Sequence, residues 1–234
     1  MYLILIIVIV LCIIAFLTWA SADIRSGVYL STLCQARTTG RSAISLTFDD
    51  GPDPHMTPRI LEILERHNIK AVFFLIGRKA EEFPDIVRQI QSKGHTIGNH
   101  TYSHSIKFTI GKQGYVRHEI SMCQDIIGSI TGKRPLLFRP PFGVTNPIIS
   151  KAVSEKNLLT IGWSIRSLDT ISNKSTDAVY RRISRKLHNG AVVLLHDRLE
   201  NADILLNMIL EETEHRKIKA VSIEELLDIR TYDD

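Results

Sequence analysis

Two neighbouring aspartates and a spaced pair of histidines are the residues of this sequence best suited to chemistry. Asp49 and Asp50 lie in the segment TFDDGP, and His100 and His104 lie four positions apart in HTYSH. On one helical turn, that spacing would point both imidazoles the same way. Two imidazole nitrogens and one carboxylate leave positions open for water and substrate, as a catalytic metal site requires. We therefore expect Asp50, His100 and His104 to bind a divalent metal, with zinc favoured and cobalt, nickel, manganese or iron as alternatives.

The neighbouring aspartates also allow a division of labour between two carboxylates. A metal acidifies its bound water toward a pKa of about 7, so a carboxylate that faces this water would act as the base. Asp50, Gly51 and Pro52 form a strong turn signal as well, and a turn is compatible with exposed carboxylates. His196 ends the apolar run AVVLLH, where a histidine is either a core residue or, beside these groups, a general acid.

The elements that must position these side chains are short β-branched runs that alternate with amphipathic stretches from residue 41 onward. This pattern predicts βα units around a mostly parallel sheet. Asn146 before Pro147, and Ser222 three residues before Glu225, predict the starts of two helices. The expected strands, seven in all, are Ala43 to Phe48, Ala71 to Ile76, Thr96 to Gly98, Leu136 to Arg139, Thr160 to Ser164, Ala191 to His196 and Lys219 to Val221.

The unusual polar residues all fall at the carboxyl ends of these predicted strands. In a parallel barrel those ends share one face, where the loops after the strands build active sites. Residues that lie far apart in the sequence would therefore meet at a single mouth. The residues concerned are Asp49, Asp50, His100, His104, Arg139, Asp169 and His196.

The N-terminal segment is a separate region of the chain. Residues 1–22 carry no charged side chain, and the apolar run ends near Trp19. About 20 helical residues cross a membrane, and a tryptophan suits the headgroup interface. We expect an uncleaved transmembrane anchor; the alternative is a signal peptide cleaved at the small residues around Ser21. We expect a tether over 23–40 and a catalytic domain over 41–234.

Composition narrows the function classes. The chain has 234 residues, a net charge of +4, 44% hydrophobic residues and 23% charged residues, as one ordinary globular domain has. Its acidic and basic residues are interspersed, so nucleic-acid binding is not expected. Cys12, Cys34 and Cys123 are too few and too scattered for a disulfide framework.

Five short segments carry a family resemblance. They are TFDDGP at 47–52, HTYSH at 100–104, RPPFG at 139–143, SLDT at 167–170 and LLH at 194–196. In type and order they resemble the polysaccharide deacetylase family, the NodB-homology domain of carbohydrate esterase family 4, over about residues 41–228. The resemblance implies an α/β fold, a distorted (β/α) barrel of about seven parallel strands, here preceded by the N-terminal transmembrane helix.

The resemblance also implies catalytic roles for matching positions. Asp49 would be the general base, and Asp50, His100 and His104 would be the metal ligands. Arg139 would orient Asp49 and keep it ionised, because a nearby guanidinium favours the charged carboxylate. The remaining catalytic pair is His196, which would protonate the departing amine, and Asp169, which would hold its imidazolium.

The same resemblance implies the substrate contacts and the reaction. Pro141, Phe142 and Leu194 would bind the substrate, with the Phe142 backbone amide stabilising the oxyanion and Leu194 lining the acetyl pocket. The reaction would remove N-acetyl groups from hexosamines of a polysaccharide, with peptidoglycan or another envelope glycan as the substrate. Such a substrate places the domain outside the cytoplasm, although Arg25 and Arg37 follow the apolar span, a distribution that the positive-inside rule does not favour for an external domain.

Some positions depart from the family pattern and leave alternatives open. Arg166 stands where the family often has an acidic residue, Thr170 where it often has tryptophan, and Phe142 where tyrosine is common. Losing the tryptophan would remove an aromatic wall from the site, and Trp163 is either a replacement for it or a core residue. A non-catalytic glycan-binding relative and a non-haem iron oxygenase are the alternative functions; the complete set of base and acid residues disfavours both.

Overall fold

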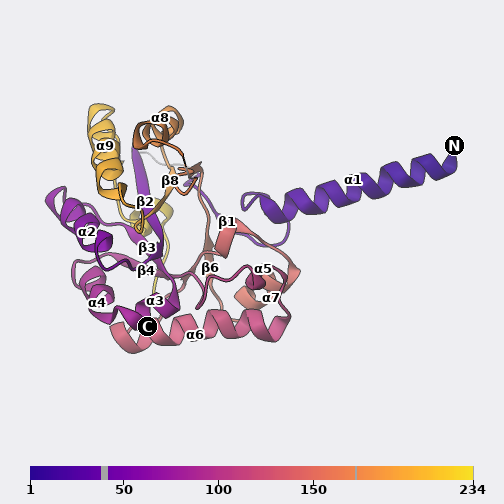
Figure 1. Ribbon diagram of the computed structural model, residues 1–234, viewed down its shortest axis with the longest axis horizontal. Helices are drawn as coiled ribbons and strands as arrows, with labels where there is room; N and C mark the ends of the chain where they lie inside the picture. Colours follow the sequence, from indigo (N-terminus) through magenta and orange to yellow (C-terminus); the bar gives the residue numbers. More distant parts are fainter. Residues whose placement is uncertain (38–41, 172, 234) are drawn as a thin grey trace.

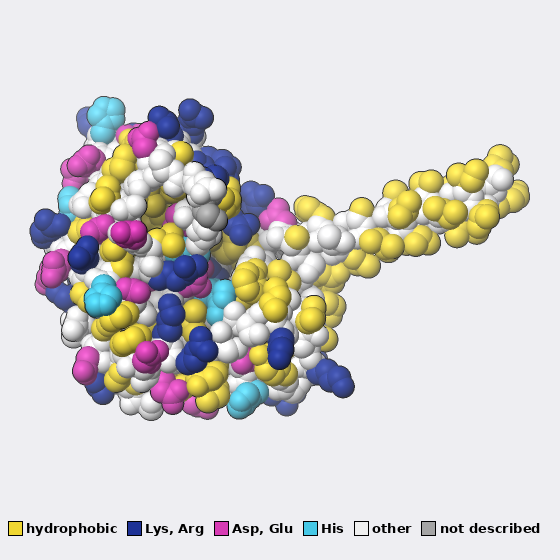
Figure 2. Space-filling view, viewed as in Figure 1, with side chains coloured by type: hydrophobic (Ala, Val, Ile, Leu, Met, Phe, Trp, Pro, Cys, Tyr) yellow, Lys and Arg dark blue, Asp and Glu magenta, His cyan; other side chains and the backbone are white. Residues whose placement is uncertain are grey.

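The computed structural model of this chain describes residues 1–37, 42–171 and 173–233. One long apolar helix, α1 (Tyr2–Ala22), projects from a body built by the rest of the chain (Figure 1). The expected start of the catalytic domain at residue 41 and the end of the expected tether lie outside the described residues. The side chains of α1 are apolar and exposed over nearly its whole length, whereas those of the body are mixed in type (Figure 2).

The body is organised around one parallel sheet in the order β1-β6-β5-β4-β3-β2-β8-β7, with β9 paired to β2. The order begins at β1 and ends at β7, and no ladder joins these two strands within the described residues, so the sheet is a half-barrel. The strands are β1 (Thr32–Leu33), β2 (Ala43–Gly51), β3 (Val72–Leu75), β4 (Thr96–Asn99), β5 (Leu137–Phe138), β6 (Leu159–Ile161), β7 (Ile165–Arg166), β8 (Val192–His196) and β9 (Lys219–Ala220).

The helices pack around this sheet and bury its apolar side chains (Figure 1). The predicted helix starts are confirmed, since the Asn146 side chain accepts from the Ile149 amide and Ser222 Oγ accepts from the Glu225 amide. The helices of the body are α2 (Met56–Arg66), α3 (Gly77–Glu82), α4 (Pro84–Ser92), α5 (Lys107–Ile110), α6 (Gln113–Thr131), the 3-10 turn η1 (Pro141–Gly143), α7 (Pro147–Ser154), α8 (Thr176–Lys186), α9 (Ala202–His215) and α10 (Ile223–Leu227).

The central strand β2 explains why the site forms where it does. Every residue of β2 is buried, as in a strand with neighbours on both sides and layers on both faces. It pairs with β3 and β8, and the ladder with β8 places Asp49 opposite His196. The candidate base and acid, which are far apart in the sequence, are therefore neighbours on adjacent strands.

The structure confirms the α/β class and each predicted strand, and it adds two short ones. β7 follows the predicted strand over 160–164, which in the structure ends at Ile161. β1 lies within the expected tether and pairs with β6. Ile24 is buried and Gln35 bridges to Ala191, so much of the segment packs against the body.

Candidate active site

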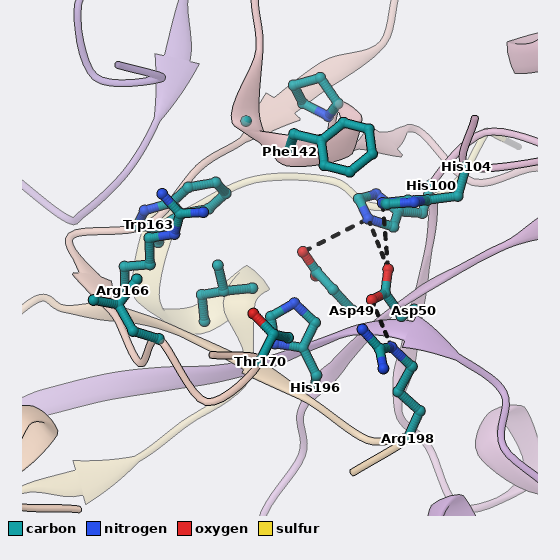
Figure 3. Close-up of a pocket in the computed structure, with 14 residues that line it drawn as sticks. Asp49, Asp50, His100, His104, Phe142, Trp163, Arg166, Thr170, His196 and Arg198 are labelled. Carbon is teal, nitrogen blue, oxygen red and sulfur yellow. Dashed lines mark hydrogen bonds and ion pairs between the residues drawn. The ribbon is translucent and has the colours of Figure 1, made fainter. Parts of the chain in front are cut away.

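A pocket of about 150 Å³ lies at the carboxyl ends of the central strands (Figure 3). Most of the residues singled out from the sequence line it, so their predicted convergence is confirmed. Arg139, Pro141 and Asp169 are not in the lining; Arg139 and Asp169 contact lining residues from behind. The predicted residues in the lining are Asp49, Asp50, His100, His104, Phe142, Leu194 and His196.

Three of these residues form the candidate metal site. Ligand atoms of Asp50, His100 and His104 lie within 4.8 Å of one another. Asp50 Oδ1 is 3.3 Å from His104 Nε2 and 3.6 Å from His100 Nε2. The Nδ1 atom of His100 is 2.7 Å from the Arg139 carbonyl oxygen, so Nδ1 carries the proton and Nε2 keeps its lone pair. This donor set fits a divalent metal.

The two histidines converge for a different reason from the one expected. The segment from His100 to His104 is a loop after β4, not a helical turn. Thr101 and His104 take φ values of 66° and 50°, and the Thr101 hydroxyl accepts a hydrogen bond from the His104 amide. These left-handed residues fold the loop back, so that both imidazoles face Asp50.

Burial and neighbouring charges set the protonation states of the ligands. Burial, followed by the repulsion of His100, lowers the pKa of His104 to about 4, so its imidazole is neutral at pH 7. Burial acts to raise the pKa of Asp50, but the hydrogen bond and charge of His100 and the charges of the other histidines outweigh it and lower the pKa. An ionised Asp50 beside a neutral His104 imidazole is the state in which these two side chains bind a metal.

Asp49 is held by a fully buried arginine. Arg139 Nη1 donates to Asp49 Oδ1 over 2.6 Å and to Thr47 Oγ1 over 2.8 Å. The same guanidinium donates to the carbonyl oxygens of Ile161 and Gly162, and it lies 4.1 Å from the centre of the Phe74 ring. One oxygen of Asp49 is therefore fixed, while Oδ2 lies on the side of His100, at 3.8 Å from its Nε2.

His196 forms a second oriented pair, with Asp169. His196 Nδ1 is 2.8 Å from Asp169 Oδ1, and the His196 backbone amide donates to Asp169 Oδ2 over 3.0 Å. Ser167 Oγ donates to Asp169 Oδ1 and fixes the carboxylate. Burial acts to lower the pKa of His196, but the hydrogen bond and charge of Asp169 outweigh it, so the net shift is upward. The protonated imidazole is therefore favoured.

Of the three predicted substrate contacts, two lie in the pocket lining and one lies outside it. Phe142 and Leu194 line the pocket, but Pro141 does not, and its neighbour Pro140 takes its place. Pro141 as a substrate contact stays a prediction; the backbone turns sharply after it at Phe142, whose φ is 62°. The turn also brings Gly143 so close to Trp163 that a Cβ atom there would lie 2.6 Å from the indole ring.

Arg198 is a site residue that the sequence analysis missed. Its Nε donates to Asp50 Oδ2 over 2.9 Å, which leaves Oδ1 facing the two imidazoles (Figure 3). The signal in the sequence that could have identified Arg198 is its position two residues after His196, the last residue of a strand. Trp163, Arg166 and Thr170 also line the pocket; Trp163 and Arg166 lie on the side away from His100 and His104, and Thr170 lies next to His196 (Figure 3).

This arrangement is that of a class of hydrolase in which an oriented candidate base and an oriented candidate acid, Asp49 and His196, flank a candidate metal site on a parallel α/β half-barrel. A family model described as polysaccharide deacetylase matches residues 36–161, more than half of the chain. The chain belongs to the polysaccharide deacetylase family.

Individual relatives agree with this assignment. A peptidoglycan-N-acetylglucosamine deacetylase of Bacillus cereus is 38% identical over 67% of this chain and 56% of its own length. A chitooligosaccharide deacetylase of Azorhizobium caulinodans is 37% identical over 72% of this chain and 80% of its own length. The solved structure of the Bc1960 peptidoglycan N-acetylglucosamine deacetylase superposes with a TM-score of 0.80, at 30% identity, over 86% of this chain and 95% of that one. The chain thus spans little more than half of the first relative.

Proposed function

We propose that this protein is a metal-dependent N-deacetylase that hydrolyses N-acetyl groups of hexosamine residues in a polysaccharide. The observation that carries the proposal is the ladder between β2 and β8, which sets Asp49 beside His196. Each of the two has a fixed partner on its far side, Arg139 for Asp49 and Asp169 for His196. Amide hydrolysis needs both a base for the attacking water and an acid for the leaving nitrogen.

The metal would be held by Asp50, His100 and His104, and zinc is the favoured ion because two imidazoles and a carboxylate are common zinc ligands. When bound there, a divalent metal supplies a Lewis acid and an acidified water. Arg198 holds the second oxygen of Asp50 and so keeps the carboxylate aimed at the imidazoles.

Asp49 accepts a proton from the attacking water at Oδ2, because Oδ1 is occupied by Arg139. The buried guanidinium of Arg139 holds the Asp49 carboxylate in this orientation. His196 donates its Nε2 proton to the departing amine, since Nδ1 is bonded to Asp169. The Phe142 backbone amide stabilises the developing oxyanion, and Leu194 forms the wall against which the acetyl methyl group packs.

The proposed substrate is an envelope glycan, with peptidoglycan first. Named relatives act on peptidoglycan and on chitooligosaccharides, which share N-acetylglucosamine. Helix α1 is long and apolar enough to cross a membrane, with a mean hydropathy of 3.2, and only 6% of its apolar stretch is buried in the body. We infer that α1 anchors the domain on the extracytoplasmic side, where such glycans lie.

Retention of α1 is supported by contacts at its end. Ser21 Oγ donates to the Thr145 carbonyl oxygen over 2.7 Å, and the Thr145 amide donates to the Ser21 carbonyl oxygen over 3.0 Å. Cleavage next to Ser21 would remove or fray a segment that is part of the folded body. We therefore favour an uncleaved anchor over a signal peptide.

The test is acetate release by the full-length protein in detergent. The protein is stripped with chelator, reloaded with zinc, cobalt, nickel or manganese, and given peptidoglycan or N-acetylglucosamine oligomers. We expect activity to disappear on stripping and to return with metal. Metal binding without acetate from any glycan would instead support the non-catalytic glycan-binding alternative.

A further inference from the structure

The C-terminal end of α1, residues 19–22, is hydrogen-bonded to the loop that lines the catalytic pocket, and we call this end the foot of α1. Thr145 follows the turn at Phe142, is 2% exposed, and bonds to Ser21 through its backbone. Its hydroxyl also donates to the Ala20 carbonyl oxygen over 3.2 Å, and Ala20 is fully buried. The end of the apolar helix is therefore held close to the active-site mouth.

A second cavity, of about 320 Å³, lies between the foot of α1, the segment before and within β7, and helix α8. Trp163 and Arg166 line both this cavity and the catalytic pocket, so the two share a wall. Basic side chains lie on the body close to the point where α1 joins it (Figure 2). We call this cavity the foot pocket.

The side chains that line the foot pocket carry a net positive charge. Asp23 is neutralised by Arg25, which bonds to both of its carboxylate oxygens. Arg166, Arg182 and Lys186 also line the pocket, and none of them has an acidic partner within the part of the chain that the structure describes. Arg182 Nε donates to the Arg166 carbonyl oxygen over 2.9 Å, which fixes the guanidinium, and its other donors have no hydrogen-bond acceptor among the described residues.

A buried hydroxyl adds a further unmet hydrogen bond. Ser164 lines the foot pocket, and its Oγ is buried without a hydrogen-bond partner among the described residues. Buried polar atoms without a partner are rare, and a bound ligand is one of the ways in which they are satisfied. Three unpaired cations and one free hydroxyl suit a compact group with several anionic oxygens, which a phosphate provides and a single carboxylate does not.

The position of the foot pocket indicates where this phosphate comes from. Trp19, at the end of the apolar helix, lines the pocket, and tryptophans at such positions mark the headgroup level of a membrane. A phosphate in the pocket would therefore lie at the membrane surface. Because the pocket shares a wall with the catalytic site, a sugar attached to that phosphate would lie beside Asp49 and His196.

We propose that the foot pocket binds the phosphate or pyrophosphate group of a membrane lipid that carries the glycan to be deacetylated. The substrate class is then a lipid-linked N-acetylhexosamine rather than a free polysaccharide. The second half of this inference, deacetylation of the lipid-linked sugar, rests on the proposed deacetylase function. The first half, phosphate binding by the foot pocket, does not depend on that function. The two halves are tested separately.

Binding is measured by tryptophan fluorescence of the full chain in neutral detergent micelles. The chain has 2 tryptophans, Trp19 and Trp163, and both line the foot pocket. Farnesyl pyrophosphate should change the emission saturably, and the double variant Arg182→Gln with Lys186→Gln should raise its Kd at least about tenfold, since a hydrogen bond to a charged group contributes about 1.5–3 kcal/mol. Arg185→Gln, in the same helix turn but outside the pocket, is the matched control and should change Kd less than about twofold.

Three results would overturn phosphate-lipid binding. The first is no saturable change with farnesyl pyrophosphate, and the second is an unchanged Kd in the double variant. The third is equally tight binding of inorganic pyrophosphate, which would make the pocket a site for free anions. Equally tight phosphatidylglycerol binding would make it a general lipid site and would remove the link to substrate.

Turnover tests the second half. N-acetylglucosamine on farnesyl pyrophosphate and free N-acetylglucosamine oligomers are compared as substrates. The double variant should lower kcat/KM about tenfold for the lipid-linked sugar and leave the oligomers unchanged. Equal losses for both would contradict the lipid-linked substrate. If neither sugar is deacetylated, the deacetylase proposal fails, and the fluorescence result still decides the foot pocket.

Discussion

The two walls of the catalytic pocket are built on different principles. The inner wall, defined here as Asp49, Asp50, His100, His104 and His196, comes from strand ends and the loop after β4. The outer wall comes from the loop between β6 and β7, from edge strand β7 and from the loops after β7 and β8, and its members are Trp163, Arg166, Thr170 and Arg198. Asp49, Asp50 and His100 are at most 7% exposed, whereas Arg166, Thr170 and Arg198 are exposed.

This difference shows which part of the pocket the fold fixes. A buried charged group must have its partners built in, because desolvation makes an unpaired charge costly. Asp49 and His196 accordingly each have a buried or half-buried partner of opposite charge. In the outer wall, Arg198 shares this requirement because it bonds to the buried carboxylate of Asp50, whereas Arg166 and Thr170 are exposed and no buried charge depends on them in the described part of the chain. We therefore expect the inner wall to set the reaction and the outer wall to affect which glycan binds.

The largest expected effect is the loss of turnover in Asp49→Asn. Removing a general base costs about 10²–10⁴-fold in kcat. Because Asp49 is not among the three candidate metal ligands, the variant should keep its metal, measured by elemental analysis beside acetate release. Near wild-type turnover with full metal content would contradict the role of Asp49.

The second prediction compares two arginines that face the same indole ring, one behind the inner wall and one in the outer wall. The guanidiniums of Arg139 and Arg166 lie 5.6 Å and 5.7 Å from the Trp163 ring centre. Arg139→Met leaves Asp49 buried without its partner and should lower the free energy of unfolding by about 3–5 kcal/mol. Arg166→Met, at an exposed position, should change it by less than about 0.5 kcal/mol in the same urea titration. Similar losses in both variants would remove the distinction between the walls.

The inner wall was also the more predictable wall from sequence. Asp49 and His196 stand at the ends of apolar runs, where burying a polar side chain costs free energy of folding. A polar residue at such a position therefore indicates a functional site. The convergence of His100 and His104 was predicted correctly, but on the wrong geometry, because the left-handed conformations of Thr101 and His104 leave no signature in residue types. No pattern in the sequence predicted the burial of His95, which is 4% exposed and whose pKa burial lowers to about 4.

The features that the sequence did not predict depend on contacts between distant segments. β1 is only Thr32–Leu33, and it exists because β6, far along the chain, offers an edge for pairing. Arg198 points at Asp50 only because the loop after β8 passes over the end of β2. Two-residue strands and loop directions of this kind have no local periodicity from which to read them.

The third prediction concerns the pH dependence set by His196. Asp169→Asn removes the charge that raises the pKa of His196 and leaves burial, which lowers it. Since the protonated imidazole is the acid, the alkaline limb of the kcat/KM profile should move to lower pH, with a loss of about tenfold at neutral pH. A limb at its original pH would mean that another group donates the proton.

The same substitution should alter stability with a defined sign. The folded-state pKa of His196 is raised above the unfolded value of about 6.5. The resulting stabilisation is therefore fully present below pH 6.5 and is lost as the pH rises through the folded-state pKa. Wild-type protein should exceed Asp169→Asn in urea resistance at pH 6 by more than at pH 9.

The smallest expected effect tests whether the outer wall can be changed without touching the chemistry. Thr170 is exposed and lines the pocket, and Thr170→Trp would add an aromatic surface for sugar stacking. An aromatic contact contributes about 0.5–1.5 kcal/mol, so KM for a glycan oligomer should fall about two- to tenfold while kcat stays unchanged. Thr176→Trp, on α8 and outside the catalytic pocket, is the control and should leave KM as it was. A fall in kcat for Thr170→Trp would show that the outer wall also positions the reacting groups, because an inserted ring would then have displaced them.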